Sequence, residues 1–324
     1  MWCLKNETPY AAEREWLRDG NGKEVWVVAI KCTYDIQLDG QLLLSPQQQP
    51  VHAGLVQSAT TGEVRYETDL GPEKRYTDVI VNGHAWIPTA SRRSPVLAGF
   101  KIGSVTRLAN IYPERPIAHA ESIDGFIKVP LIYQNMSTGS VRNGEFYNPH
   151  GRKKPAIEFL HHTDSELGFG AISSHWRGRA ELAGTYDRHW QATRYPLPPE
   201  DLNPLFWQIA PRPQQLQLKG GEKVVLANMS KADSHQPAMI SFFLPRQSLI
   251  FTTVFSHGIT VEHRPKIHTV ILEPEDSRVS IVWHSALPCH AEVNLLKFTR
   301  IWEKKRINHI NRRPERTFPE LGVL

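Results

Sequence analysis

The chain contains few cysteines and no long hydrophobic run. Its three cysteines, Cys3, Cys32 and Cys289, are an odd number at very wide spacing, which argues against a disulfide framework and fits a reducing compartment. The apolar run 25–30 is far too short to span a bilayer. The first seven residues lack a basic region followed by an apolar one, so we expect no secretory signal. These absences predict a cytoplasmic protein without a transmembrane helix.

The chain also lacks the short motifs of common enzymes. It has no Gly-x-Ser-x-Gly elbow, no P-loop and no Gly-x-Gly-x-x-Gly after a strand. Cys289 ends a predicted strand, where a buried, inert thiol is the better interpretation. His161, His162 and Asp164 come nearest to a metal site, but adjacent side chains on an extended chain point in opposite directions. We therefore predict no catalytic residue, no cofactor and no metal.

Carboxylates leave one enzymatic alternative open. Glu67, Asp69, Asp124 and Asp187 could supply the acid and base of glycoside hydrolysis, although such a set can be drawn from any chain with 33 acidic residues. The alternative is a carbohydrate-active hydrolase on a β scaffold. Alanine at Glu67, Asp69 and Asp187 would abolish turnover in such an enzyme and would leave a folded binding protein functional.

The composition is that of a soluble globular protein. The 324 residues are 40% hydrophobic and 22% charged, and the chain is long enough to bury a large core. The net charge of +5 is scattered, except that seven Lys or Arg lie in residues 300–316 against two Glu. A basic run of this kind can contact nucleic acid or an acidic protein face. No nucleic-acid motif accompanies it, so we interpret it as a solvated terminal segment.

Strand patterns dominate the sequence. In residues 25–36 apolar and aromatic side chains recur on one face, while the other ends in Lys31, Thr33 and Asp35, which predicts a half-buried strand. Asp39 and Gly40 predict a hairpin turn back through residues 42–44. Further short strands are expected at residues 78–86, 100–109, 126–133, 224–229, 239–244, 248–255, 266–272, 278–284 and 292–302.

The predicted fold is mainly β: two packed antiparallel-sheet lobes, sandwich- or barrel-like, with long loops and few short helices. Helical turns are expected at residues 11–18, 187–193 and 200–209. The first lobe would span residues 1–164, including a loop-rich stretch at 135–164. The second would span residues 165–302, followed by a basic tail at 303–324. A single interwoven unit is the alternative.

Residues 168–221 are the most distinctive segment. Seven aromatic residues lie between positions 168 and 210, interleaved with glycine and proline rather than set at helical spacing. Aromatic and arginine side chains are the types that anchor protein interfaces. The alternative is that the aromatics pack inward and hold an irregular segment together, with the arginines on the surface. The candidate protein-binding residues are Trp176, Arg177, Arg179, Trp190, Phe206 and Trp207.

Several ordered motifs resemble a bacterial family of domains of unknown function whose members are encoded beside type VI secretion genes, particularly those for PAAR-like spike-tip proteins. The similarity runs from about residue 25 to 289. The motifs that carry it are Arg65-Tyr66-Glu67-Thr68-Asp69-Leu70, Thr77 to Trp86, Gly168-Phe169-Gly170, Gly184-Thr185-Tyr186-Asp187 with Trp190, Phe206 with Ala210-Pro211, and Gly220-Gly221-Glu222.

The resemblance implies a non-enzymatic adaptor or chaperone. Such a protein would hold a PAAR-like tip protein and its cognate effector in the bacterial cytoplasm and help load them onto the secretion spike, where the spike trimer is a further potential partner. No membrane or nucleic-acid partner is expected. The chain departs from the family pattern between residues 117 and 162 and after Trp302, which are therefore candidate regions for partner choice. A structural component that travels with the spike is a third possibility.

Overall fold

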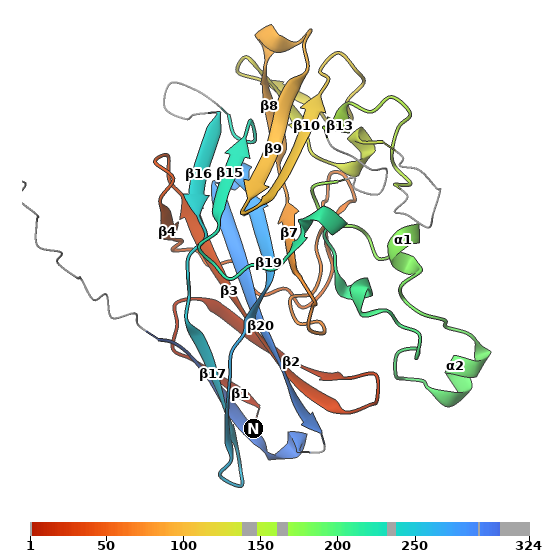
Figure 1. The fold of residues 1–324 in the computed structure, drawn as a ribbon, viewed down its shortest axis with the longest axis vertical. Coiled ribbons are helices and arrows are strands. Elements are labelled where there is room, and N and C mark those ends of the chain that lie inside the picture. The colour runs from red at the N-terminus through yellow and green to blue at the C-terminus, as the bar shows by residue number, and fades with distance from the viewer. Residues whose placement is uncertain (1, 138–147, 161–167, 232–237, 291, 305–324) are drawn as a thin grey trace, which may run out of the picture.

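The computed structural model describes residues 2–137, 148–160, 168–231, 238–290 and 292–304. The predicted fold class is confirmed: the protein is mainly β, with several sheets and two short α-helices in the described residues. No sheet in this part of the chain closes into a barrel. Strands fill the centre of the molecule, and both α-helices lie on a loop-rich projection at one side (Figure 1).

A seven-stranded sheet forms the centre of the fold. Its order is β14–β7–β19–β20–β3–β2, and β4 pairs with one end of β3. All neighbours are antiparallel except β7 and β19, which run parallel. The bounds are β2 Ala11–Arg18, β3 Glu24–Ile36, β4 Leu42–Leu44, β7 Thr77–Val81, β14 Gln215–Leu216, β19 Lys266–Glu273 and β20 Arg278–His290.

Strand β3 is buried on both faces, so the prediction of a half-buried strand is wrong in that respect. Its apolar face lies in the main core, as expected, but Val27, Lys31 and Thr33 on the other face are also at most 1% exposed. On the second face a small cluster forms, in which Leu70 packs on Val27 and on Val282 of the neighbouring strand β20. Lys31 is tolerated there because its ammonium reaches a buried carboxylate. Polar residues on a strand therefore did not mark a solvated face.

Residues 11–18 form strand β2, so the predicted helical turn at this position is wrong. All eight residues pair with β3, from Ala11 opposite Lys31 to Arg18 opposite Glu24. A helix of eight residues is marginal in water, whereas pairing with a long neighbouring strand gives partners to the backbone groups of residues 11–18 that face β3. The tertiary contact therefore decides the conformation.

Three further sheets and one hairpin surround this centre. A four-stranded sheet has the order β1–β21–β17–β18, a five-stranded sheet β13–β10–β9–β15–β16, and a three-stranded sheet β11–β12–β8. The hairpin pairs β5 with β6. The bounds are β1 Cys3–Asn6, β5 Val56–Gln57, β6 Val64–Tyr66, β8 His84–Pro88, β9 Val96–Ile102, β10 Val105–Ile111, β11 Glu121–Ile123, β12 Phe126–Pro130, β13 Ile157–Phe159, β15 Lys223–Ala227, β16 Met239–Phe243, β17 Leu249–Phe255, β18 Thr260–His263 and β21 Leu296–Glu303.

The predicted hairpin at Asp39 and Gly40 is confirmed, and two predicted strands are each split in two. Gly40 has a φ of +81° and leads into β4, which returns along β3. The segment 100–109 turns at Gly103, with a φ of +55°, between β9 and β10. The segment 78–86 is divided between β7 and β8, with residues 82 and 83 between them. Both divisions fall at a glycine within the predicted segment, Gly103 and Gly83.

One hydrophobic cluster joins the three largest sheets. It includes Trp26 from β3, Phe100 from β9, Phe251 from β17 and Leu272 from β19, all at most 1% exposed. The predicted lobe boundary at residue 164 lies outside the described residues. Strands from both sides of it share these sheets, since β9 pairs with β15 and β3 pairs with β20. Most of the basic tail, residues 305–324, is also outside the described part.

Candidate protein-binding site

Residues 173–207 form a projection that we call the arm, visible at the right of Figure 1. It contains α1 (Arg177–Ala180), α2 (Arg188–Thr193) and the 3-10 turn η3 (Pro204–Trp207). The predicted helical turn at 187–193 is confirmed, and the Asp187 carboxylate caps it by accepting from the backbone N–H of Trp190 at 2.8 Å. The predicted turn at 200–209 is limited to η3. Prolines at 196, 198, 199 and 204 prevent a longer helix after α2.

Arg179 fastens the arm to the body. Its guanidinium makes a two-pronged contact with Glu67, Nη1 to Oε1 and Nη2 to Oε2, both at 2.6 Å. It also donates to the backbone carbonyls of Phe206 and Ile172. Arg179 is only 5% exposed. The expectation that it lies on the surface is therefore wrong, because it is the partner of a carboxylate that the fold places beneath the arm.

The far end of the arm is held by Asp78 on β7. Its carboxylate accepts hydrogen bonds from the side chain of Gln208 and from the backbone N–H groups of Ile209 and Ala210. It also pairs with Lys74 at 2.7 Å, and both side chains are buried. Backbone donors that face a carboxylate fix a loop rigidly, because each would otherwise be buried without a partner. The arm is thus tied at both ends.

The motif at residues 65–70 supplies further buried contacts of this kind. Arg65 and Tyr66 both reach Glu273 at the end of β19. Asp69 pairs with the buried ammonium of Lys31 at 3.0 Å and accepts from the backbone of His52. Burial is the largest of the effects that raise the pKa of Tyr66. These residues of the family signature hold the scaffold together.

The remaining predicted site residues differ in their surroundings. Trp176 is half-buried and packs edge-on against Tyr133 at 4.8 Å between ring centroids. Arg177 is exposed and pairs with Glu181 one helical turn away. Trp190 is half-buried, and its indole N–H donates to the carbonyl of residue 197. Arg177 and Trp190 support the arm's own structure, whereas Trp176 packs the arm against the body.

Phe206 and Trp207 lie next to each other in η3, with ring centroids 5.2 Å apart. Phe206 also lies beside the Arg179 guanidinium, 5.2 Å from its ring centroid. Trp207 lines a groove, whereas the other five predicted residues do not. The structure therefore assembles only part of the predicted set around one surface.

The groove lies between the arm and the seven-stranded sheet and has a volume of about 690 Å³. Its lining is mainly apolar and comes from three parts of the chain, together with residues 72 and 73. The β2–β3 hairpin contributes Leu17, Val25 and Val27, β20 contributes Ala286 and Pro288, and the arm contributes Pro198, Pro199, Leu202, Pro204 and Trp207. Charged side chains at its rim include Arg18, Asp19, Glu73, Arg194 and Glu200.

Arg194 stabilises the wall of the groove. Its guanidinium donates to the carbonyls of Pro198 and Gly20 and pairs with Glu200. It therefore connects the arm to the β2–β3 turn across the groove. Sequence reasoning missed this contribution and that of the sheet. The run of prolines at 196–204 was the available signal, since it indicates an extended wall that cannot collapse into a helix.

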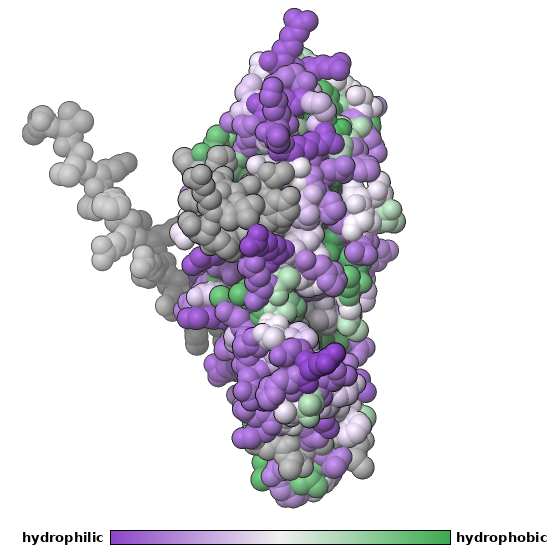
Figure 2. All heavy atoms as spheres, turned by 90° about the vertical axis from the view of Figure 1, so that its right-hand side faces the viewer, coloured by the Kyte–Doolittle hydropathy of each residue, from purple (hydrophilic) through white to green (hydrophobic). Residues whose placement is uncertain are grey.

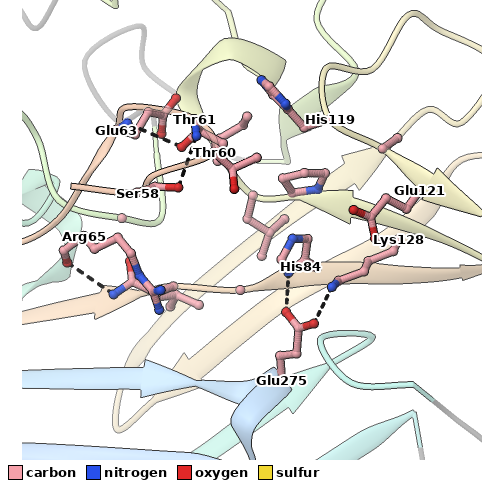
Figure 3. Close-up of a pocket in the computed structure, with 18 of the residues that line it drawn as sticks. Ser58, Thr60, Thr61, Glu63, Arg65, His84, His119, Glu121, Lys128 and Glu275 are labelled. Atoms are coloured by element: carbon pink, nitrogen blue, oxygen red, sulfur yellow. Dashed lines mark hydrogen bonds and ion pairs between the residues drawn. The ribbon is translucent and has the colours of Figure 1, made fainter. Parts of the chain in front are cut away.

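A second depression, of about 610 Å³, is polar (Figure 3). Glu275 lies at its base, with His84 Nδ1 at 2.6 Å and the Lys128 ammonium at its other oxygen. These partners, His84 first, lower the pKa of Glu275 to about 2. Glu63 accepts from the backbone N–H of Tyr133, and burial raises its pKa. His84, Lys128 and Glu275 therefore pair within this pocket, while Arg65 and Asp276 pair with Glu273 and Arg278 outside its lining.

A family model described as "Uncharacterized protein conserved in bacteria (DUF2169)" matches residues 21–284. The chain belongs to the DUF2169 family. The match covers the arm, the polar depression and the 65–70 motif, and it includes part of the groove, whose lining residues 17–20, 286 and 288 lie outside it. Its extent agrees with that of the resemblance seen in the sequence. No curated protein and no solved structure matches the chain.

The structure adds little support for metal or thiol chemistry in this DUF2169 protein. No group of three or more His, Cys, Asp or Glu in the described residues is placed to hold a metal ion. His161, His162 and Asp164 lie outside that part. Cys289 is a buried free thiol, and burial raises its pKa to about 11. No helix among the described residues is long and apolar enough to cross a membrane.

The carboxylates considered for sugar chemistry have other contacts. Glu67 and Asp69 are each paired with a buried cation, Asp187 caps α2, and Asp124 pairs with Lys231 at the surface. Asp69 is 4% exposed and lies in neither depression. Their observed contacts are those of structural residues.

Proposed function

We propose that this DUF2169 protein is a non-enzymatic adaptor or chaperone. In this proposal it binds a PAAR-like spike-tip protein, its effector, or both, and helps load them onto the type VI secretion spike in the bacterial cytoplasm. The class of partner comes from the resemblance of the sequence motifs. The single structural observation that supports a binding role is the apolar groove between the arm and the central sheet.

The groove has the chemical character of a protein-docking surface. An apolar floor with one large aromatic side chain, Trp207, is surrounded by charged groups, which is the core-and-rim arrangement of protein interfaces. The arm is tied at its two ends by Arg179 and Asp78, and Arg194 links it to the β2–β3 turn, so little ordering is required when a partner binds. A pre-formed groove with a polar rim also suits a chaperone, which must release its partner.

The surface on the side of the molecule that carries the arm favours a small apolar contact with a partner rather than a large one. Figure 2 shows that hydrophilic residues dominate it and that hydrophobic areas between them are small. A partner would therefore insert a limited apolar segment into the groove while polar groups pair around it.

The test is co-expression of the chain with the PAAR-like protein or effector encoded beside its gene, followed by affinity capture and size-exclusion chromatography. We expect a stoichiometric complex. Leu202→Asp places a charge in the groove wall and should weaken the complex at least tenfold, because the charge must be desolvated. Tyr195→Asp is the matched control, since Tyr195 lies on the same arm but is 70% exposed and outside the groove.

Circular dichroism of each variant separates loss of binding from loss of folding. Failure of the wild-type chain to bind any of the neighbouring gene products would contradict the adaptor proposal. A complex that tolerates Leu202→Asp as well as Tyr195→Asp would place the interface elsewhere.

A further inference from the structure

The five-stranded sheet has one face in the core and one face turned outward. Ala98, Phe100 and Ile102 of β9 are at most 1% exposed, while Leu97, which precedes them, and Lys101, which lies between the last two, are exposed. The same alternation holds in β15 and β16, where Val224, Leu226 and Phe242 point inward. The strands lie side by side from β16 to β13 in the upper half of Figure 1.

The outer face carries apolar side chains where a solvated sheet face would normally be polar. Met239 and Phe243 of β16 are each 62% exposed, and Leu97 is 37% exposed. The register continues this surface across the sheet, because Ala227 lies between Met239 and Gly99, and Gly99 lies opposite Leu108. Several exposed apolar residues therefore share one continuous face, which is typical of an interaction site.

The same face is basic. Lys101 and Lys223 are exposed on it, and neither makes an ion pair within the described part of the chain. Val225 lies directly opposite Lys101, so the apolar and basic groups are interleaved. The acid on the adjoining strand β13, Glu158, is already paired with Arg115. A complementary surface must therefore supply both apolar contact and negative charge.

Strand addition is not the mode that this geometry favours. Strand β16 is at the edge of the sheet, but the carbonyl oxygen of Ser241 faces the turn before β4, where a Cβ added to Gly40 would lie only 2.1 Å from it. The turn thus covers the middle of the edge and hinders a continuous ladder of hydrogen bonds there. A partner would instead lie across the face.

Two other occupants fit the charge poorly. A second copy related by a two-fold axis would bring the basic face of one chain against that of its partner. The chain's own C-terminal residues 305–324 are the other alternative, but they carry five Lys or Arg and only two Glu, so their net positive charge would be repelled by the basic face.

We propose that the outer face of the five-stranded sheet binds an acidic, partly apolar surface of a protein partner. This proposal rests on the adaptor function and extends it. With this face and the groove, one chain offers two chemically distinct docking surfaces, one dependent on opposite charge and one mainly apolar. An adaptor of this kind can hold two proteins at once.

The test uses the complex with the PAAR-like protein and effector encoded beside the gene. Charge reversal by Lys101→Glu with Lys223→Glu should weaken binding of one of these proteins about tenfold or more. It should also reduce the dependence of the remaining affinity on NaCl between 50 and 500 mM. Lys153→Glu with Lys297→Glu is the matched control, since both lysines are exposed, lie off this sheet and change the net charge equally.

The outcomes separate this proposal from the adaptor function. If the wild-type complex forms and both double variants bind equally well, the sheet face is not the site, while the adaptor function stands. If the wild-type chain binds neither protein, both proposals fail. A wild-type dimer that Met239→Asp converts to a monomer would assign the face to a second copy and overturn the acidic partner.

Discussion

Removal of the Glu67 carboxylate is the sharpest perturbation of this fold, because Arg179 would be left buried without its counter-ion. Arg179 is 5% and Glu67 17% exposed, and two hydrogen bonds of 2.6 Å join them. Loss of one partner of a buried ion pair costs about 3–5 kcal/mol of unfolding free energy. Glu67 retains some contact with water, so we expect Glu67→Ala to cost about 3 kcal/mol, near the lower end.

Urea unfolding followed by tryptophan fluorescence measures this cost. The matched control is Glu181→Ala, which removes the partner of Arg177 on the same arm. Those side chains are about half exposed, and exposed pairs one helical turn apart contribute only about 0.3–0.5 kcal/mol. The single variant Arg179→Met and the double variant with both substitutions complete a double-mutant cycle. We expect it to give a coupling energy of about 1–3 kcal/mol between Glu67 and Arg179.

Equal costs for Glu67→Ala and Glu181→Ala, both below about 1 kcal/mol, would refute the assignment of Glu67 and Arg179 as the anchor of the arm.

The structural role of Glu67 also limits which alanine variants can test for a hydrolase. Because Glu67 and Asp69 both neutralise buried cations, alanine at either position destabilises the fold whatever the function is. Asp187 is exposed, and its loss as a helix cap costs only about 1 kcal/mol. Asp187→Ala is therefore the more informative variant of the three.

Two further predictions concern ionisable groups. Burial lowers the pKa of His284 from 6.5 to about 4, so the unfolded chain binds the proton more tightly. The stability from this neutral imidazole is complete above about pH 6.5 and falls by up to about 3 kcal/mol as the pH drops to 4; urea midpoints between pH 7 and 4 will show the decline, and His284→Gln should make it shallower. Part of the decline should remain in that variant, because burial also lowers the pKa of His263 and His268. Of the thiols, Cys3 is exposed whereas Cys32 and Cys289 are buried, so Ellman's reagent should titrate one thiol in the native protein and three in 6 M guanidinium; rapid native titration of all three would contradict the buried positions.

Local signals in the sequence were sufficient for the β class and for several boundaries. The turn at Gly40 and the cap at Asp187 each depend on the chemistry of one or two residues, so they could be predicted directly. The segment 11–18 could not, because its local pattern permits either a helix or a strand and only the length of β3 beside it decides. The solvation of the second face of β3 was also undecidable, since that face is covered by residues about 40 positions away.

In the candidate site, too, some features could be predicted from local sequence and others depend on tertiary contacts. The aromatic and proline-rich sequence of residues 168–221 correctly indicated an irregular segment with only short helices and strands. It did not distinguish Arg179, which is buried, from Arg177, which is exposed, although the two are separated by a single residue. The distinction arises from Glu67, more than 100 residues earlier in the chain.

The sequence by itself therefore determined the β class, the family signature and the absence of familiar catalytic motifs, because these depend on residue type and short-range order. The tertiary structure alone decided which charges are buried, where the groove lies and which sheet face remains open. Those properties arise from contacts between distant segments, as when the β2–β3 hairpin, β20 and the arm together enclose the groove. Whether a charged side chain is buried and which partner it has depend on how these segments pack together, so they cannot be predicted from any one segment alone.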